Sequence, residues 1–287
     1  MKRISKKNIN QKLIGNSGSK LLIYFNKKYI IRKLSINKDT STRLENQYKK
    51  IINFKKNKQI YVPEIYKSGY ERFNFYYDME YVNGENFPEF ILRSNSFIIN
   101  RLFKKILVFI VECKKKSEDK FYDSNLILNK IKELEKSKTL KSKSYKHIFE
   151  KLKLFKWQNI SLSQNHGDLS LENILVRNEN IFFVDISKNF IESFYLDLSK
   201  LLFDLLSGWS FRNLNEYENR IQVISIKQNY LKFLHNNFDT NELNLIKMLT
   251  LLDFLRVLNY CKNIDHLKLL KTKLKIFYDH FNNPMLW

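Results

Sequence analysis

Residues 166–175 read His-Gly-Asp-Leu-Ser-Leu-Glu-Asn-Ile-Leu, and residues 182–187 read Phe-Phe-Val-Asp-Ile-Ser. The first stretch runs into a β-type segment at residues 173–177, and the second lies in another at residues 181–186. A polar turn, Asn-Glu-Asn, joins the two segments, so the sequence predicts a β-hairpin. This hairpin is expected to carry the second aspartate of the quoted stretch back to the first.

Three oxygen-bearing side chains are then expected to meet in one cleft, namely Asp168, Asn173 and Asp185. One carboxylate can orient an acceptor hydroxyl and accept its proton, while the amide and the second carboxylate supply hard oxygen ligands to Mg²⁺. Phosphoryl transfer depends mainly on positioning and on neutralisation of charge, and these groups provide both. The spacing therefore favours a phosphotransferase.

The quoted stretch resembles the H-G-D-x-x-x-x-N catalytic loop of the aminoglycoside phosphotransferase and choline kinase group. Asp-Ile-Ser at residues 185–187 resembles the group's metal-binding strand and stands where protein kinases have Asp-Phe-Gly. The resemblance implies a protein-kinase-like, two-lobed α+β fold and an ATP- and Mg²⁺-dependent kinase acting on a small molecule. It also implies that Asp168 is the catalytic base and that Asn173 and Asp185 bind Mg²⁺. His166 is a second candidate catalytic residue, although in the resembling families it mainly braces the loop.

The N-terminal part has the pattern of a small antiparallel sheet with one helix. Apolar runs at residues 20–25 and 28–34 flank Asn-Lys, which predicts a hairpin. Residues 42–45, Thr-Arg-Leu-Glu, fit the Ser/Thr-x-x-Glu capping box, so a helix is expected to begin there. Two further strands are expected at residues 61–65 and 73–82.

Asn-Gly at residues 83–84 is a natural turn and is expected to form the hinge that ends the small lobe. The prediction is an N-terminal nucleotide-binding lobe at residues 1–82 and a C-terminal catalytic and acceptor-binding lobe at residues 83–287. In the C-terminal lobe, helical periodicity surrounds the catalytic hairpin.

Several features of the predicted C-terminal lobe are local. Ser96 is expected to cap a helix, and the lysine-rich residues 130–146 are expected to form an exposed connection. A long helix is expected at residues 239–260 and another near residues 266–280. Asp197 is expected to be a buried brace or a helix cap and is not counted as catalytic.

Two segments of the small lobe are expected to hold ATP. Gly15, Ser17 and Gly18 precede the first strand pair, where kinase-like folds place a phosphate-covering loop. The segment is not a Walker A loop, because no G-x-x-x-x-G-K-[ST] occurs. Glu80 and Val82 lie in a segment that resembles the hinge, whose backbone would bind the adenine edge. The alternative for the glycine-containing segment is a plain turn, and the alternative for the hinge segment is an edge strand followed by a turn.

The second strand offers two cations for the phosphates, Arg32 and Lys33, which alternate to opposite faces. Matching the V-A-I-K pattern selects Lys33, with Arg32 left open as the alternative. In the helix, Gln47 shares a face with apolar residues, whereas Glu45 is expected to cap. If Gln47 is the partner of Lys33, the usual Lys–Glu ion pair becomes an ion–amide hydrogen bond.

The composition of the chain limits the classes of protein to which it can belong. The chain has 287 residues, of which 44% are hydrophobic, enough for a large core. Cys113 and Cys261 lie far apart without disulfide or zinc spacing, which fits a reducing, cytoplasmic environment. The most apolar stretch, residues 106–111, is too short to cross a bilayer.

The formal net charge of +22 would suit a nucleic-acid partner. However, the chain contains no alanine and its lysines are spread along its whole length, the bias of an AT-rich genome. A generally cationic surface explains the charge, and no specific nucleic-acid partner is expected.

The expected acceptor is a small hydroxylated molecule such as an amino alcohol, a sugar or an aminoglycoside-like metabolite. The acidic and aromatic residues available for a cationic acceptor make no distinctive cluster; they are Asp204, Trp209, Glu216, Tyr217 and Glu218. The sequence does not predict the oligomeric state.

Two other functions stay open as alternatives. A protein kinase is disfavoured because no Ala-Pro-Glu follows Asp185 and because only eleven residues separate it from Asp197. A non-catalytic scaffold or nucleic-acid-binding protein with this fold is disfavoured because all three oxygen-bearing side chains are intact.

Overall fold

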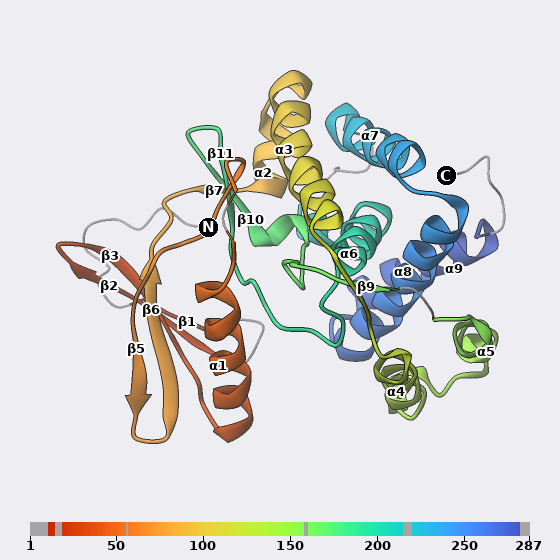
Figure 1. The fold of residues 1–287 in the computed structure, drawn as a ribbon, viewed down its shortest axis with the longest axis horizontal. Coiled ribbons are helices and arrows are strands. Elements are labelled where there is room, and N and C mark those ends of the chain that lie inside the picture. Colours follow the sequence, from red (N-terminus) through yellow and green to blue (C-terminus); the bar gives the residue numbers. More distant parts are fainter. Residues whose placement is uncertain (1–10, 15–18, 56, 158–159, 215–219, 282–287) are drawn as a thin grey trace.

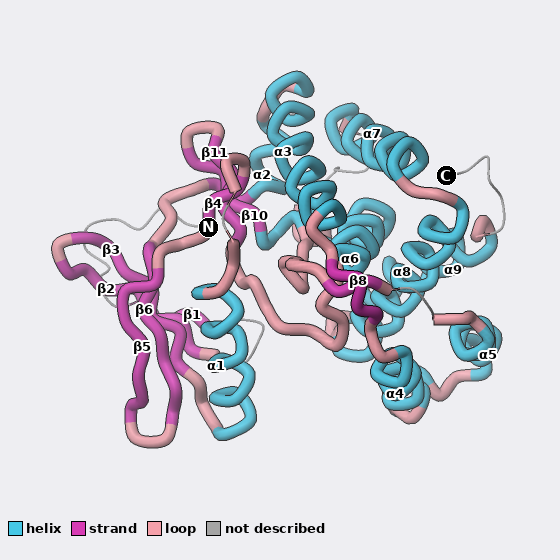
Figure 2. The backbone as a smooth tube through the Cα atoms, viewed as in Figure 1, coloured by secondary structure: helices cyan, strands magenta, loops and turns pink. Residues whose placement is uncertain are grey.

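The computed structural model describes residues 11–14, 19–55, 57–157, 160–214 and 220–281. Most strands lie on one side of the molecule and most helices on the other (Figure 1, Figure 2). An antiparallel sheet with one helix is followed by a mostly helical part, which confirms the predicted α+β class.

The N-terminal sheet has five antiparallel strands in the order β1-β2-β3-β6-β5. The predicted hairpin is confirmed, because Asn26 of β2 pairs with Lys28 of β3 and Lys27 at the turn has a φ of 58°. β3, which carries Lys33, is the middle strand of the sheet. The strand bounds are Gln11–Ile14 (β1), Lys20–Asn26 (β2), Lys28–Leu34 (β3), Ile65–Glu71 (β5) and Asn74–Glu80 (β6).

The helix beside this sheet, α1, spans Lys38–Ile52, so the predicted start at Thr42 is wrong. The side chain of Asn37 accepts a hydrogen bond from the Thr40 amide, and the Thr40 hydroxyl accepts one from the Asn37 amide. This reciprocal Asn–Thr pair forms the capping box, which the Ser/Thr-x-x-Glu pattern misses. Glu45 therefore lies inside the helix and not at its cap.

Aromatic packing holds α1 against β6. Leu44 and Tyr48 of the helix contact the cluster that includes Phe75 and Tyr77 of the strand. Burial of each such side chain contributes about 1.5–3 kcal/mol. This packing fixes the helix beside the sheet. The side chain of Gln47 then reaches Lys33 of β3 and Tyr77 of β6.

The single strand predicted at residues 61–65 is wrong. Ile60–Tyr61 form a separate short strand, β4, and β5 begins only at Ile65. Pro63 lies between the two and has no amide hydrogen with which to continue a strand ladder.

A second sheet has the order β4-β11-β10-β7. Its β10–β11 hairpin confirms the prediction, and Asn178 and Glu179 at the turn have φ values of 51° and 58°, as a type I′ turn requires. Because β4 precedes residues 83–84 and β7 follows them, the sheet draws strands from both predicted lobes, and the lobe boundary stays a prediction. The remaining bounds are Glu85–Asn86 (β7), Ile174–Arg177 (β10) and Asn180–Phe183 (β11).

The C-terminal part consists of helices and one two-stranded sheet. The helix bounds are Phe87–Arg93 (α2), Ser96–Lys115 (α3), Ser124–Glu135 (α4), Lys146–Leu154 (α5), Phe194–Ser207 (α6), Ile221–Asn237 (α7), Thr240–Tyr260 (α8) and Ile264–Asp279 (α9). The strand bounds are Glu118–Phe121 (β8) and Ser161–Leu162 (β9), and 3-10 turns include Leu171–Asn173 (η3) and Trp209–Phe211 (η4).

In the C-terminal part, the predicted start of α8 is right and that of α3 is wrong. Asp239 caps α8 and accepts hydrogen bonds from the amides of Asn241 and Glu242, as expected. The cap of α3 is Asn95, whose side chain accepts from the Ile98 amide, and not Ser96. Asn and Ser are both good caps, and the neighbouring pair leaves the choice open in the sequence.

The expectation that residues 130–146 form an exposed connection is wrong. α4 covers residues 130–135 of this segment, and two 3-10 turns and the start of α5 follow. Ile131, Leu134, Leu140 and Tyr145 are buried in the main core. The high lysine content makes the amphipathic pattern of this segment hard to recognise in the sequence. In the structure its apolar side chains face the core and its charged side chains face solvent.

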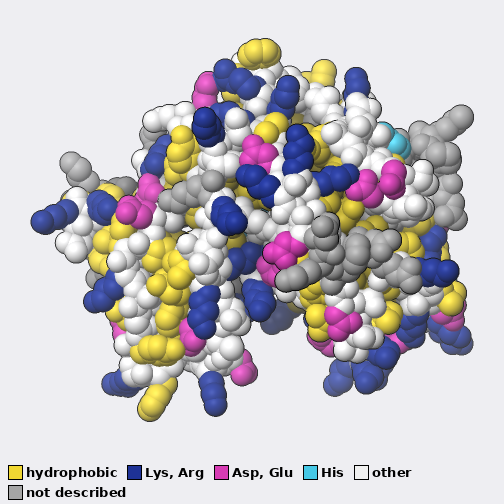
Figure 3. Space-filling view, viewed as in Figure 1, with side chains coloured by type: hydrophobic (Ala, Val, Ile, Leu, Met, Phe, Trp, Pro, Cys, Tyr) yellow, Lys and Arg dark blue, Asp and Glu magenta, His cyan; other side chains and the backbone are white. Residues whose placement is uncertain are grey.

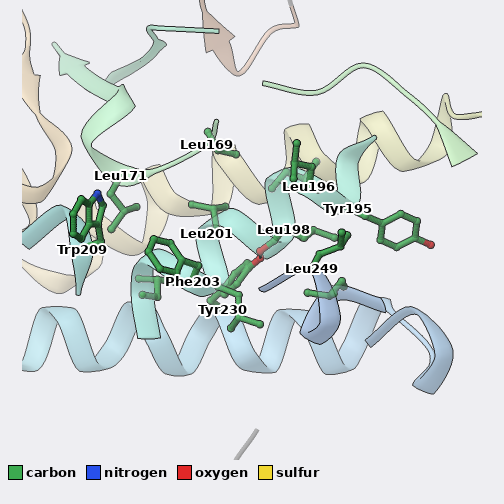
Figure 4. Close-up of a cluster of buried hydrophobic side chains, with 14 of the residues drawn as sticks. Leu169, Leu171, Tyr195, Leu196, Leu198, Leu201, Phe203, Trp209, Tyr230 and Leu249 are labelled. Atoms are coloured by element: carbon green, nitrogen blue, oxygen red, sulfur yellow. Dashed lines mark hydrogen bonds between the residues drawn. The ribbon is translucent and has the colours of Figure 1, made fainter. Parts of the chain in front are cut away.

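Helix α6 lies in the centre of the C-terminal core, and nearly all of its residues are buried. Figure 4 shows Leu169 and Leu171 lying over this helix, near Leu201 and Phe203. On the far side, the hydroxyl of Tyr230 donates to the Leu198 carbonyl at 2.7 Å. The segment 166–173 therefore rests on a rigid, buried support.

No described helix combines the length and the apolar character that a bilayer span requires. On the face drawn in Figure 3, Lys and Arg side chains are scattered over both the strand-rich and the helical part. The scatter on this face agrees with a generally cationic surface.

Candidate active site

Asp168 and Asn173 contact each other at the end of the β10–β11 hairpin. The Nδ2 group of Asn173 donates to the Asp168 carbonyl at 2.8 Å and lies 3.3 Å from its Oδ2. The amide of Val184 donates to the Asn173 carbonyl at 3.0 Å, so Asp185 follows a residue that is bonded to Asn173. The structure thus places the three residues that the sequence singled out close to one another along the backbone.

Asp185 has a strained backbone and an open side chain. Its φ is 60°, a left-handed conformation that few residues other than glycine adopt, and its side chain is 48% exposed. Strain of this kind costs about 1–3 kcal/mol and concentrates at functional sites. The conformation turns the carboxylate toward Lys33, which contacts it.

Lys33 is the cation at this site. It is only 5% exposed, and its ammonium contacts Asp185 and lies 3.4 Å from Oε1 of Gln47. Burial lowers the pKa of Lys33, but Asp185 and Tyr77 together more than offset this, so the pKa lies above its ordinary value. Arg32 points to the opposite face of the strand, where it pairs with Asp78.

Gln47 is held by a second donor. The hydroxyl of Tyr77 donates to Oε1 of Gln47 at 3.0 Å, and burial raises the pKa of Tyr77 to about 12. The amide oxygen therefore faces both Lys33 and Tyr77. The ion–amide contact expected in place of a Lys–Glu pair is present.

Glu80 and Val82 lie where the two sheets meet. The Glu80 amide donates to the Glu64 carbonyl at 2.8 Å. Val82 is buried against Leu175 and Phe182 of the hairpin in a small apolar cluster. The predicted phosphate-loop residues Gly15, Ser17 and Gly18, as well as Glu216, Tyr217 and Glu218, lie outside the described residues.

His166 is completely buried and both of its ring nitrogens are engaged. Nε2 donates to the Val184 carbonyl at 2.9 Å, and Nδ1 accepts from the Asp168 amide at 3.2 Å. Burial lowers the pKa of His166 to about 4. A neutral ring with two backbone partners holds the two halves of the site together, which supports the bracing role over proton transfer.

We expect the difference in the free energy of unfolding between His166→Gln and the parent to change with pH between pH 6.5 and 4. In this window the unfolded imidazole binds a proton and the buried one does not, so acidification lowers the free energy of unfolding, by about 3 kcal/mol in all. Urea unfolding across this range measures the slope in the two proteins. Burial raises the pKa of Asp197 to about 7, which acts in the opposite sense, but equally in both. Parallel curves would contradict the buried neutral histidine.

Gly167 lies where no side chain fits. Its φ is 86°, and a β-carbon there would lie 2.0 Å from the Ser187 carbonyl oxygen. Its amide donates to Asp197 at 2.9 Å. The glycine thus allows the segment after Asp185 to pass directly beside the catalytic loop.

Lys50, which the sequence did not single out, ties α1 to this junction. Its ammonium donates to Oδ1 of Asn165 at 2.8 Å, to the Ser187 carbonyl at 2.9 Å and to Oε2 of Glu192 at 2.8 Å. A hollow of about 380 Å³ opens beside it, with Lys49 among its lining residues. None of the predicted site residues lines this hollow, so it is not the candidate active site.

The donor set suits a hard divalent cation that shares its coordination with phosphate. Nδ2 of Asn173 faces Asp168, which leaves its Oδ1 for a cation, and the Asp185 carboxylate is half exposed. No group of three His, Cys, Asp or Glu side chains in the described part of the chain can hold a metal by itself. The residues present therefore fit Mg²⁺ held partly by a nucleotide.

Three charged residues of α6 also face the catalytic loop. Asp197, predicted as a brace, accepts from the His166 amide at 2.6 Å and the Gly167 amide at 2.9 Å. Lys200 was missed as a site residue, and Asp204, named above as available for a cationic acceptor, is instead fully buried. Their helical spacing in a largely apolar helix signals that each charge needs a buried partner, but it does not identify that partner.

No protein-family model matches the sequence, and no curated protein matches it either. Solved structures do match over nearly the whole chain. A GDP complex of a variant of aminoglycoside 2'-phosphotransferase IIIa has a TM-score of 0.62 at 13% identity, covering 95% of this chain and 92% of that one. An amicoumacin kinase in complex with AMP-PNP, Ca²⁺ and Ami gives 0.56 at 14%, covering 96% and 89%. A choline kinase from Cryptosporidium parvum gives 0.55 at 13%, covering 98% and 91%. These similarities establish the fold.

Proposed function

We propose that this chain, built on the protein-kinase-like fold, is an ATP- and Mg²⁺-dependent phosphotransferase acting on a hydroxyl of a small molecule. Amino alcohols, sugars and aminoglycoside-like metabolites are the acceptor classes in question. The observation that carries the proposal is a single site in which Lys33 contacts Asp185 and Asn173 contacts Asp168. A buried cation, two carboxylates and an amide oxygen at that spacing are what phosphoryl transfer requires.

In the proposed reaction, Asp168 orients the acceptor hydroxyl and takes its proton. The acceptor oxygen forms a bond to the γ-phosphorus while the bond from this phosphorus to the β–γ bridging oxygen breaks, and ADP leaves. Mg²⁺, when held by Asn173 and Asp185, neutralises charge on the phosphates. Lys33 would turn from Asp185 to the α- and β-phosphates when nucleotide binds.

We further propose how the rest of the nucleotide is held. The backbone of Glu80 and Val82 would bind the adenine edge, beside the apolar surface that Val82 forms with Leu175. Gln47 would orient Lys33. The loop with Gly15, Ser17 and Gly18 would cover the phosphates.

Two observations favour a small-molecule acceptor over a protein. The segment between Asp185 and Phe194, the first residue of α6, is short, so it has no room for a long activation loop. The neighbours described above are named as kinases of aminoglycoside, amicoumacin and choline, and two of them hold a nucleotide. These names support the proposal and leave the acceptor open.

Nucleotide binding tests the proposal without knowledge of the acceptor. We expect ATP with Mg²⁺ to raise the melting temperature by several degrees, because a ligand at 100 times its dissociation constant adds about 2.7 kcal/mol to the free energy of unfolding. ATP with EDTA is the control and should raise it less. A melting temperature indifferent to both additions would favour the non-catalytic scaffold. A panel of amino alcohols, sugars and aminoglycosides, scored by ATP consumption, would then identify the acceptor.

A further inference from the structure

Helix α6 presents three charged side chains to the catalytic loop at successive turns. Asp197, Lys200 and Asp204 are spaced by three and four residues, which places them on one face of the helix. All three are buried, with exposed fractions of 1%, 7% and 0%. Buried charges are costly unless they are paired, so their partners identify what they do.

Each of the three holds a different part of the loop. Asp197 accepts from the amides at the start of the loop, as described above, and Asp204 accepts from the Leu171 amide at 2.7 Å. Between them, the ammonium of Lys200 lies 3.0 Å from Oδ1 of Asp168. The two acids thus hold backbone, whereas Lys200 holds the side chain of the proposed base.

The loop has no cation of its own. Residues 166–173 contain neither Lys nor Arg, so the positive charge beside Asp168 comes from a helix that follows the loop in sequence. Asp168 itself is 42% exposed, and its Oδ2 lies 3.3 Å from the Asn173 amide group. One carboxylate oxygen is therefore fixed against the buried helix, while the side chain as a whole remains open.

We propose that Lys200 is a positioning residue for phosphoryl transfer: its ammonium fixes Oδ1 of Asp168 and so turns Oδ2 to the acceptor hydroxyl. The inference rests on the proposed function, in which Asp168 is the base. Lys200 stays protonated while the proton of the acceptor moves to Asp168.

Removal of the ammonium should free the Asp168 carboxylate from its fixed position. We expect the crystal structure of Lys200→Met to show this carboxylate rotated, with Oδ2 no longer beside Nδ2 of Asn173. Lys200→Arg keeps the charge and should keep the parent position. Arg256→Met removes a cation that pairs with Asp253 and should leave Asp168 in place. An unmoved carboxylate in Lys200→Met, or a displaced one in Arg256→Met, would overturn the inference.

Kinetics separate positioning from a merely structural role. With an acceptor from the panel, Lys200→Met should lower kcat roughly 100-fold. The KM for ATP should stay close to that of the parent, and Lys200→Arg should recover most of the rate. A lower kcat with a raised KM for ATP and a lower melting temperature would mean that Lys200 only supports the fold. The crystal structures need no turnover, so a failure of the proposed function would not be mistaken for a failure of this inference.

Discussion

Asp168→Ala should abolish phosphoryl transfer and leave ATP affinity nearly unchanged. The side chain contacts Asn173 and Lys200 and makes no contact with Lys33, the residue proposed to hold the phosphates. Loss of a general base alone lowers the rate by roughly 10²- to 10⁴-fold, and loss of orientation of the acceptor adds to this. Initial rates of ADP formation with acceptor, together with ATP binding by calorimetry, measure the two effects separately.

Two controls make the Asp168 result specific. Asp168→Asn preserves the shape and leaves an oxygen for Lys200, so a loss of rate in this variant reports the charge and not a collapsed loop. Asp265→Asn makes the same change at an exposed position at the start of α9 and should be silent. If Asp168→Ala turned over as fast as the parent, the assignment of the base would be wrong.

The second large effect should follow from Asp185→Ala, which we expect to weaken nucleotide binding only when Mg²⁺ is present. The carboxylate is one of two proposed protein ligands of the cation, and even indirect disturbance of a metal site costs roughly 10- to 100-fold in affinity. Calorimetric titration of ATP with Mg²⁺ and with EDTA gives the metal-dependent share of the affinity. The parent should show a large difference between the two conditions and the variant a small one.

Asp185→Asn is the matched control for the unusual backbone. Asn tolerates a left-handed φ nearly as well as Asp, so this variant removes the negative charge while the φ of 60° remains accessible. It should lie between the parent and Asp185→Ala in metal-dependent affinity. Equal affinity in all three proteins, with and without Mg²⁺, would exclude Asp185 as a metal ligand.

The parts of the fold that the sequence predicts well are those with a complete local signal. The β2–β3 and β10–β11 hairpins each show two short apolar runs around a polar turn, and Lys27, Asn178 and Glu179 take the positive φ values that such turns need. The start of α8 is equally local, because Asp239 caps the helix with its own neighbours. At these positions the local sequence predicts the structure without knowledge of tertiary contacts.

The errors occur where the local signal was ambiguous or where a distant partner decides. Two capping patterns compete near the start of α1, and the pair of Asn37 and Thr40 prevails. Ile60–Tyr61 become a strand only because β11, far along the chain, offers an edge for parallel pairing. No sequence window contains that information.

The candidate site divides in the same way. The spacing of Asp168, Asn173 and Asp185 and the strand position of Lys33 were readable, and the structure brings these residues together, although their roles stay predictions. Lys200 was not readable as part of the site, because its contact with Asp168 depends on how α6 packs under the loop. A lone lysine in an apolar helix signals a buried partner but does not name it.

The most direct test is a crystal structure of the protein with Mg²⁺ and the non-hydrolysable analogue AMP-PNP. The account predicts Mg²⁺ at about 2.0–2.1 Å from Oδ1 of Asn173 and from an Asp185 oxygen, with the γ-phosphate facing Asp168 and Lys33 on the phosphates. A nucleotide bound elsewhere, or a metal ion held without Asn173 and Asp185, would contradict it.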